Sequence, residues 1–363
     1  MTVTGSAPTQ LAHDEPQALF PEARRRRRRR WVIGAGVLIL VLAAALALIS
    51  SSGSERSAPS HRSARHDGLV RWAPPSGATA SVPPVFVAGD GKGGAGVYST
   101  ANGKLIHTLS PQGPGGPDQQ VVLSGDRRYV YFSQPTGPGA CNADILSVPT
   151  SGTSAPTVVI SDPGTIALAP SPNPASAELA WVGVTCSPSG FVTSYTLYVT
   201  NLATHATSDL GAFAGRSSDN EMAWSSDGRR LAVQNGSTVE VFEATQLSSQ
   251  TGQPLRVATG CSLSSPVLLP RANELAAIRT CYSSAGRLRS SQALVFNVAT
   301  GNPVALIASA PDGSIFQGLS LDASGQHFLL GLVASFPASA TNVQVARGRL
   351  VVISHEAPTD AEW

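Results

Sequence analysis

The stretch AWSSDGRRLAV, residues 223–233, is the clearest structural signal in this chain. Small and polar turn formers stand at its centre, and apolar residues flank them on both sides. Asp227 is suited to accept hydrogen bonds from turn amides, and Gly228 can take the positive φ that a tight hairpin requires. The flanking residues are typical of two β-strands. The stretch therefore predicts a β-hairpin.

Similar units recur along the chain at a spacing of about 50 residues. Turn residues precede an apolar strand at residues 125–128, 176–178, 227–230, 273–274 and 324–326. A second marker, a strand that ends in a small-residue turn, gives intervals of 49, 53, 47 and 49 residues between Gly103, Gly152, His205, Gly252 and Gly301. Short strands separated by turns indicate an all-β sandwich, barrel or propeller. A repeat of 40 to 50 residues with about four strands favours the propeller.

Around Trp224, Ser225, Asp227 and Gly228 the chain resembles the WD40-like propeller repeats of the TolB type, whose hallmark is an aromatic residue followed by Ser-x-Asp-Gly-Arg/Lys-x-Leu-Ala. The other repeats match this hallmark less well, and the Trp-Asp dipeptide of standard WD40 repeats does not occur. The resemblance implies a β-propeller over residues 68–357 and participation in envelope-associated protein interactions. About 290 residues divided by a repeat of about 48 predicts six blades.

The last repeat offers only three strand-like segments, so its outermost strand is expected to be missing. Residues 69–72 are a candidate replacement. Pairing of this segment with the final blade would close the ring and remove exposed strand edges.

Near the N-terminus, a run of arginines lies directly before an uncharged apolar stretch. The run comprises Arg24, Arg25, Arg26, Arg27, Arg28, Arg29 and Arg30, and the apolar stretch covers residues 31–49. At about 1.5 Å per residue these helical residues would span roughly 28 Å, close to the ~30 Å hydrocarbon core of a bilayer. Because flanking cations remain on the cytoplasmic side, we expect one transmembrane helix over residues 31–50, with the N-terminus in the cytoplasm and the propeller outside.

The other segments follow from this topology. Residues 1–30 are expected to form a disordered basic cytoplasmic tail, residues 51–67 a Ser-, Arg- and His-rich linker, and residues 358–363 a C-terminal tail. A cleavable secretory signal or a twin-arginine export signal is the alternative to the anchor. The uncharged stretch continues to Ser54, beyond the roughly 7 to 15 apolar residues of a signal peptide, and this length favours a signal-anchor.

Charge divides unequally across the predicted membrane. Residues 1–30 carry seven arginines against three acidic residues, a net charge of +4, whereas the remainder carries 18 basic and 20 acidic residues, a net charge of −2. The nearly neutral outer part argues against nucleic acid or a strongly charged substrate as the partner. Arginine and alanine in place of lysine are typical of GC-rich bacterial genomes, such as those of actinobacteria.

All four cysteines fall on the predicted outer side, where oxidising conditions permit disulfides. Cys261 opens the repeat that contains Cys281, whereas Cys141 and Cys186 follow the second strands of adjacent repeats. Of the three possible pairings, this register favours Cys261 with Cys281 and Cys141 with Cys186. A zinc site or a redox-active pair is disfavoured, because neither CxxC nor HxxxH spacing occurs.

The sequence contains no clear motif for catalysis or cofactor binding. GDGKGG, residues 89–94, satisfies GxGxxG, but it runs into another predicted strand and not into the helix that a dinucleotide loop opens. We expect a hairpin loop there, and an ordinary loop at Asp219, Asn220 and Glu221. No GxSxG elbow, HExxH motif, P-loop or calcium loop occurs. We therefore expect no enzyme activity, cofactor or metal.

Aromatic and basic side chains are the remaining candidates. Trp72, Trp181 and Trp224 are expected to pack between blades. Loop residues that are candidates to line a binding rim are Arg216, Tyr282, Arg287 and Arg289. The leading hypothesis is a non-catalytic module that binds a protein or an envelope component. The alternatives are a hydrolase or lyase with its site in the central funnel, and a sensor that signals through the cytoplasmic tail.

Overall fold

A computed structural model describes residues 69–74, 80–89, 94–110, 121–136, 141–187, 192–213, 221–247, 252–271, 273–334, 340–346 and 349–354. They belong to one compact unit, His66–Trp363. The predicted cytoplasmic tail, transmembrane helix, linker and C-terminal tail lie outside the described residues. Within the described part of the chain, no helix has both the length and the apolar character needed to cross a bilayer.

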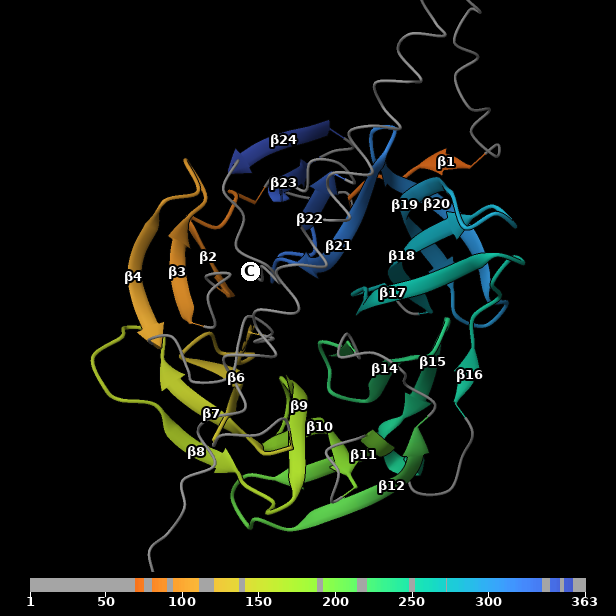
Figure 1. The fold of residues 1–363 in the computed structure, drawn as a ribbon. Coiled ribbons are helices and arrows are strands. Elements are labelled where there is room, and N and C mark those ends of the chain that lie inside the picture. Colours follow the sequence, from red (N-terminus) through yellow and green to blue (C-terminus); the bar gives the residue numbers. More distant parts are fainter. Residues whose placement is uncertain are drawn as a thin grey trace, which may run out of the picture. The chain divides into compact units, whose positions relative to one another are not determined.

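The described residues are almost entirely β-strands, in sheets that follow one another around a common centre in sequence order (Figure 1). The strands are β1 (Val70–Arg71), β2 (Val85–Gly89), β3 (Ala95–Ser99), β4 (Leu105–Ser110), β5 (Val121–Leu123), β6 (Tyr129–Pro135), β7 (Ala143–Pro149), β8 (Thr157–Ile160), β9 (Thr165–Pro172), β10 (Glu178–Cys186), β11 (Val192–Asn201), β12 (Thr207–Phe213), β13 (Met222–Trp224), β14 (Arg230–Asn235), β15 (Thr238–Glu243), β16 (Gln253–Pro254), β17 (Cys261–Leu268), β18 (Glu274–Tyr282), β19 (Leu288–Asn297), β20 (Asn302–Ser309), β21 (Ser314–Leu321), β22 (His327–Ala334), β23 (Ala340–Ala346) and β24 (Arg349–Ser354). One short 3-10 helix, Ala244–Gln246, follows β15.

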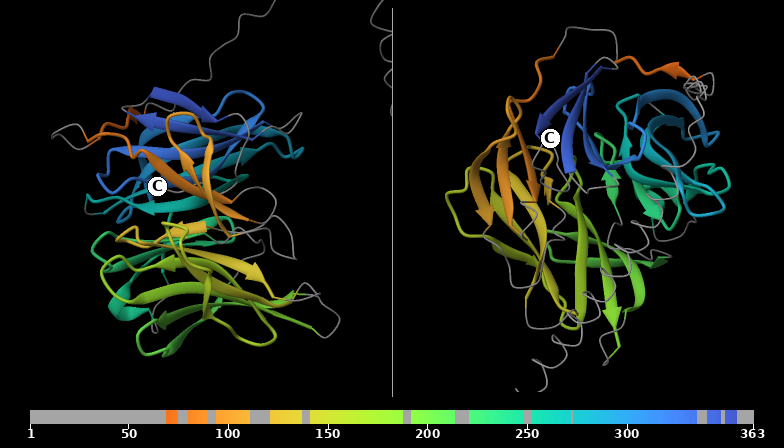
Figure 2. Two further views of the ribbon diagram at one scale, coloured as in Figure 1. Left: turned by 90° about the vertical axis from the view of Figure 1, so that its left-hand side faces the viewer. Right: turned by 45° about the horizontal axis from the view of Figure 1, so that its top comes forward.

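Strands that are neighbours in sequence pair in antiparallel fashion within each sheet (Figure 2). Strands β2 to β4 form one sheet, β13 to β16 a second, β17 to β20 a third and β21 to β24 a fourth. Strands β5 to β8 and β9 to β12 are two further meanders, which a single parallel bridge between Ala143 and Ile166 joins into one sheet. The all-β prediction is confirmed.

Strand β18 shows why the repeats read as short apolar runs. Leu275, Ala276, Ala277 and Ile278 are all fully buried. Ala276 and Ile278 pack in the cluster that includes the last sheet, whereas Leu275 and Ala277 pack in the cluster that includes β14 and β15. Because successive side chains of a strand point to opposite faces, a sheet packed between two neighbours requires apolar residues at every position of its inner strands.

The hairpin at residues 225–230 is held by a serine and an aspartate. The Ser225 hydroxyl donates to the Asp227 carboxylate (2.6 Å) and accepts the Arg230 amide (2.9 Å). The same carboxylate accepts the Arg229 amide (3.1 Å), and the Gly228 amide donates to the Ser225 carbonyl (2.8 Å). Gly228 has a φ of 68°, in the left-handed region. Side-chain and main-chain bonds thus fix this turn together.

Residues 124–129 form the same turn. The Ser124 hydroxyl donates to Asp126 (2.6 Å) and accepts the Tyr129 amide (3.0 Å). Arg127, with a φ of 60°, occupies the position of Gly228. The turn therefore keeps the same geometry although arginine replaces the glycine.

Turns of neighbouring sheets pack directly against each other. The Asn173 side-chain amide donates to the Gly228 carbonyl (3.3 Å), and a Cβ added to Gly228 would lie 2.7 Å from that of Ala175. Gly325 lies in a similar way against Pro270, whose Cγ would be 2.9 Å from an added Cβ. Glycine at these positions satisfies both the backbone conformation and the close approach.

The sequence analysis expected residues 69–72 to pair with the final blade, and this prediction is wrong. Strand β1 pairs in parallel with β20, Val70 opposite Ala305 and Arg71 opposite Leu306, and not with the last sheet. The last sheet has four strands of its own, because β23 supplies the strand that the sequence analysis missed. The sequence of β23, ATNVQVA, has polar residues interspersed and no turn marker before it, so it does not read as an apolar run.

The first described residues, 69–74 and 80–84, here called the strap, contact successive sheets. The Trp72 amide donates to the Leu306 carbonyl (2.8 Å), and the Trp72 ring lies 4.8 Å from the Phe328 ring of β22. Farther along, the Ala80 amide donates to the Gln326 side chain (3.1 Å). The strap therefore links the β17–β20 sheet to the last one.

Among the described strands, none is shared by the first and last sheets, and side-chain packing joins the two. Phe86 and Tyr98 stack with their ring centroids 5.4 Å apart, and both pack in one cluster with Leu329 of β22. Val82 of the strap packs against the same cluster. The circle of sheets is closed by this apolar contact.

We expect Gly228→Ala to destabilise the protein by about 2 to 5 kcal/mol, from left-handed strain (~1–2 kcal/mol) and overpacking against Asn173 and Ala175 (~1–3 kcal/mol). Gly286→Ala is the matched control, because Gly286 has a φ of 72° but nothing within 4 Å of an added Cβ. Thermal unfolding followed by tryptophan fluorescence measures both. Equal losses for the two variants would show that turn packing contributes nothing.

Candidate binding face

Because successive strands run in opposite directions, their ends lie alternately on two faces of the described unit. In the four-stranded sheets and meanders, the turns between first and second strands and between third and fourth strands lie on one face, here called the turn face. In the three-stranded β2–β4 sheet the β3–β4 turn lies on this face, where the Thr100 amide donates to the Pro84 carbonyl (2.9 Å). The other ends of the strands define the opposite face, here called the loop face. Short main-chain bonds tie the turn face, for example from Thr150 N–H to the Arg128 carbonyl (2.9 Å) and from Val298 N–H to the Asn273 carbonyl (2.8 Å). Both disulfides lie on the loop face.

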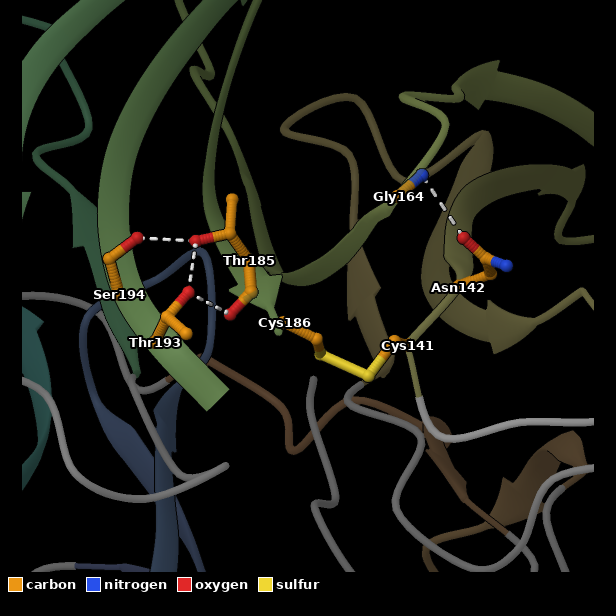
Figure 3. The surroundings of a disulfide bond; sticks show 7 residues. All are labelled: Cys141, Asn142, Gly164, Thr185, Cys186, Thr193 and Ser194. Carbon is orange, nitrogen blue, oxygen red and sulfur yellow. Dashed lines mark hydrogen bonds between the residues drawn. A yellow bond between two sulfur atoms is a disulfide. The ribbon is translucent and has the colours of Figure 1, made fainter. Parts of the chain in front are cut away.

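One disulfide joins Cys141, before β7, to Cys186, at the end of β10, with the Cα atoms 5.9 Å apart (Figure 3). It connects two different meanders, β5 to β8 and β9 to β12. Next to it, the Asn142 side chain accepts the Gly164 amide (3.1 Å), which ties the connection between these meanders to the same place. Three separate segments are thereby fixed relative to one another.

Hydroxyl groups line the strand ends beside this disulfide (Figure 3). Thr185 is hydrogen-bonded to Ser194 and to Thr193 (3.1 Å between the Thr185 and Thr193 hydroxyls). The Thr193 hydroxyl also donates to the Thr185 carbonyl (3.0 Å). These cross-strand bonds hold the β10–β11 hairpin at the end where the two strands are connected.

The second disulfide joins Cys261 to Cys281. The two residues lie directly opposite each other on β17 and β18, with Cα atoms 4.0 Å apart. The adjacent Tyr282 amide donates to the Gly260 carbonyl (2.8 Å). Both bridges have the pairing that the repeat register favours, and none of the cysteines is free.

Three of the four rim candidates lie on the hairpin beyond Cys281. Tyr282 is 43% exposed, and Arg287 and Arg289 are exposed. The hairpin is closed by the Ser283 amide, which donates to the Arg287 carbonyl (2.8 Å). Arg216 lies outside the described residues. The structure thus presents one aromatic and two guanidinium side chains on a hairpin anchored by a disulfide.

The three tryptophans expected to pack inside the fold do so. Trp72, Trp181 and Trp224 are 5%, 3% and 8% exposed. The Trp181 indole donates to Thr200 (2.9 Å), and the Trp224 indole donates to the Ser171 carbonyl of the neighbouring meander (3.0 Å). The indole N–H groups of Trp181 and Trp224 are therefore satisfied inside the fold.

The GDGKGG segment connects two strands and opens no helix. Gly89 at the end of β2 is paired with Ala95 at the start of β3, so the hairpin prediction is confirmed. Of the predicted polar loop, Asp219 and Asn220 lie outside the described residues. No group of three or more metal-ligating side chains occurs within the described ranges.

A buried carboxylate in the last sheet escaped the sequence analysis. The turn DASGQH, residues 322–327, has Asp322 at the position of Ser225 and Ser324 at the position of Asp227. Asp322 is 4% exposed and bonds to His327 Nδ1 (2.8 Å), which must donate because an ionised carboxylate only accepts. Ser324 also donates to it (2.6 Å). The sequence does contain the turn motif, but with aspartate and serine exchanged relative to the Ser-x-Asp-Gly hallmark.

Two opposing effects act on the pKa of Asp322. Burial favours the neutral acid and raises it, but hydrogen bonds from His327, Ser324 and the amides of His327 and Gln326 outweigh burial and hold the pKa below its ordinary value. In the exposed turns, hydrogen bonds from the serine hydroxyl and a turn amide lower the pKa of Asp126 and of Asp227. All three turns therefore favour the carboxylate form.

The successive meanders and their closure define a β-propeller. More particularly, the fold is TolB-like: the structure of TolB from Acinetobacter baumannii matches with a TM-score of 0.54 at 14% identity, over 77% of this chain and 65% of that chain. This chain therefore spans less than two thirds of that TolB. A putative TolB from Agrobacterium tumefaciens (TM-score 0.43, 12% identity, 63% of this chain, 82% of that chain) and oligogalacturonate lyase from Vibrio parahaemolyticus (0.45, 11%, 71%, 74%) are more distant. No protein-family model and no curated protein matches the sequence.

Because the folded pKa of Asp322 is depressed, its contribution to stability is present above the ordinary carboxyl pKa of about 3.9 and is lost as pH falls toward the folded value. We expect Asp322→Asn to lower the free energy of unfolding at pH 7 by about 1 to 3 kcal/mol. The variant should also lose less further stability than the parent between pH 5 and pH 3. Melting temperatures across this range test both effects, and parallel pH curves would contradict them.

We expect removal of either disulfide to destabilise the protein without changing its fold. Chain entropy gives about 4 kcal/mol for the bridge over 45 residues and about 3 kcal/mol for the bridge over 20. The double variants Cys141→Ser/Cys186→Ser and Cys261→Ser/Cys281→Ser, compared by urea unfolding, measure the two contributions. Free thiols in the purified native protein would contradict the pairing.

Proposed function

We propose that this chain is a membrane-anchored, extracytoplasmic propeller that binds a protein or an envelope component through its loop face, without catalysis. The anchor is the apolar segment at residues 31–50, oriented by the arginine run before it. The two disulfides support an extracytoplasmic position, because such bonds persist in oxidising compartments. We further propose six blades, counting β5 to β8 and β9 to β12 separately and β2 to β4 as the first blade.

The observation that carries the binding role is the anchored hairpin at residues 282–289. Tyr282 lies next to the disulfide, and Arg287 and Arg289 follow on the same hairpin. Tyrosine and arginine are enriched where proteins contact each other, because both combine apolar area with hydrogen-bond donors. A hairpin that is already fixed loses less conformational entropy on binding. These features suit recognition of a protein surface.

The test is photocrosslinking of the full-length protein in its native cells. The triple variant Tyr282→Ala/Arg287→Glu/Arg289→Glu should lose the specific crosslinked species, because it removes the aromatic area and reverses both charges. The matched control is Tyr129→Ala/Arg127→Glu/Arg128→Glu on the turn face, where Tyr129 is also 43% exposed. This control should crosslink as the parent does. Loss of the species in both variants, or in neither, would contradict the loop face as the binding surface.

The same proteins separate the alternative functions. Turnover of a small molecule by the purified protein, unaffected by the hairpin variant, would favour a hydrolase or lyase with a site elsewhere in the propeller. A crosslinked cytoplasmic partner that depends on the loop-face ligand would favour a sensor acting through the short tail.

A further inference from the structure

A small cavity on the turn face lies apart from the proposed binding hairpin. It has a volume of about 210 Å³ and lies between the β13–β16 sheet and the β17–β20 sheet. At roughly 30 Å³ per water in the liquid, this space corresponds to about seven waters. It is therefore suited to a ligand of fewer than about ten non-hydrogen atoms.

The base of the cavity is apolar and rigid. Val241 of β15 and Val298 after β19 line it, and both are buried in the same cluster between the two sheets. The Gln253 side chain donates to the Ala299 carbonyl (3.1 Å) across the gap, and the Arg256 amide donates to the Gly301 carbonyl (3.0 Å). The cavity walls are thus held by contacts from both sheets before any ligand arrives.

Opposite charges face the cavity from neighbouring strands. Arg230 begins β14 and Glu243 ends β15, and the two residues are directly paired in the strand register. Cross-strand partners have Cβ atoms only about 5 Å apart, yet among the described residues Arg230 and Glu243 form no ion pair with each other. The Asp227 carboxylate in the preceding turn is attracted to Arg230, which helps to lower the pKa of Asp227. Asn273 adds an amide to the lining from the next sheet.

We propose that this cavity binds a small zwitterion of the α-amino-acid class. Guanidinium groups pair with carboxylates through two parallel hydrogen bonds, which assigns the ligand carboxylate to Arg230. The Glu243 carboxylate accepts from the ligand ammonium, and Val241 and Val298 contact a short aliphatic side chain. A molecule with both charges on one carbon satisfies the two strands at once, which neither a simple anion nor a simple cation does.

Ligand-observed NMR on the purified full-length protein tests this assignment with three probes. L-alanine carries both charges, N-acetyl-L-alanine only the carboxylate, and L-alanine amide only the ammonium. We expect saturation transfer to L-alanine with a Kd at or below about 1 mM. The singly charged probes should each bind about tenfold to hundredfold more weakly, since each loses one charge-assisted hydrogen-bonded contact.

Variants test whether the saturation transfer to L-alanine comes from binding in this cavity. Arg230→Met and Glu243→Gln should each weaken L-alanine binding by about tenfold or more. Arg229→Met is the matched control, because Arg229 is the exposed neighbour in the same turn and does not line the cavity. Ala299→Met, which fills the cavity without changing charge, should also abolish binding, provided that its melting temperature equals that of the parent. Absence of L-alanine binding, equal binding of N-acetyl-L-alanine, or full binding by Arg230→Met would overturn the proposal.

Discussion

Neighbouring hairpin turns approach each other so closely that this contact governs how the sheets pack. At Gly228 the chain needs a positive φ for its own turn and an absent side chain for the turn that holds Asn173 and Ala175. The positive φ alone does not require glycine, since Arg127 has a positive φ in a corresponding turn. Both together leave only glycine. The turns therefore set how closely adjacent sheets approach, and that approach decides how deeply strands such as β18 are buried.

The last sheet has Asp322 and Ser324 in its turn where the hallmark turn has Ser225 and Asp227. The geometry of the turn explains this exchange of aspartate and serine. The first position of the turn is buried and the third is exposed in both cases. In the hallmark turn the charge occupies the exposed position and water solvates it. In the last sheet the charge occupies the buried position, where His327 and Ser324 replace water as hydrogen-bond donors. A buried carboxylate without such donors would be costly, so the exchange requires the histidine.

The local features of the repeats were readable from sequence, whereas the long-range pairings were not. The run at Leu275 to Ile278 predicts a strand buried on both faces, and the register of the repeats predicts both cysteine pairs, because a repeat places equivalent residues at equivalent heights. The partner of β1 depends instead on which strand edge is open once the ring is assembled. Neither Val70 nor Arg71 carries a signal for that choice. The rim candidates Tyr282, Arg287 and Arg289 could be found from the sequence because they lie close together in it. The opposite charges of Arg230 and Glu243 become neighbours only once β14 and β15 are in register.

The two faces of the propeller achieve rigidity by different means. On the turn face, main-chain bonds such as that from Ala244 N–H to the Arg229 carbonyl (2.7 Å) link one turn to the next within a sheet. On the loop face the connections differ in length from sheet to sheet, so no repeated main-chain bond can serve them all. Cross-links specific to each site take that role, between meanders at Cys141 and Cys186 and within one sheet at Cys261 and Cys281. The described segments beside the two disulfides differ in sequence and are held in place by the bridges. They combine two properties that selective binding requires, because variation supplies specificity and fixation reduces the entropy lost on association.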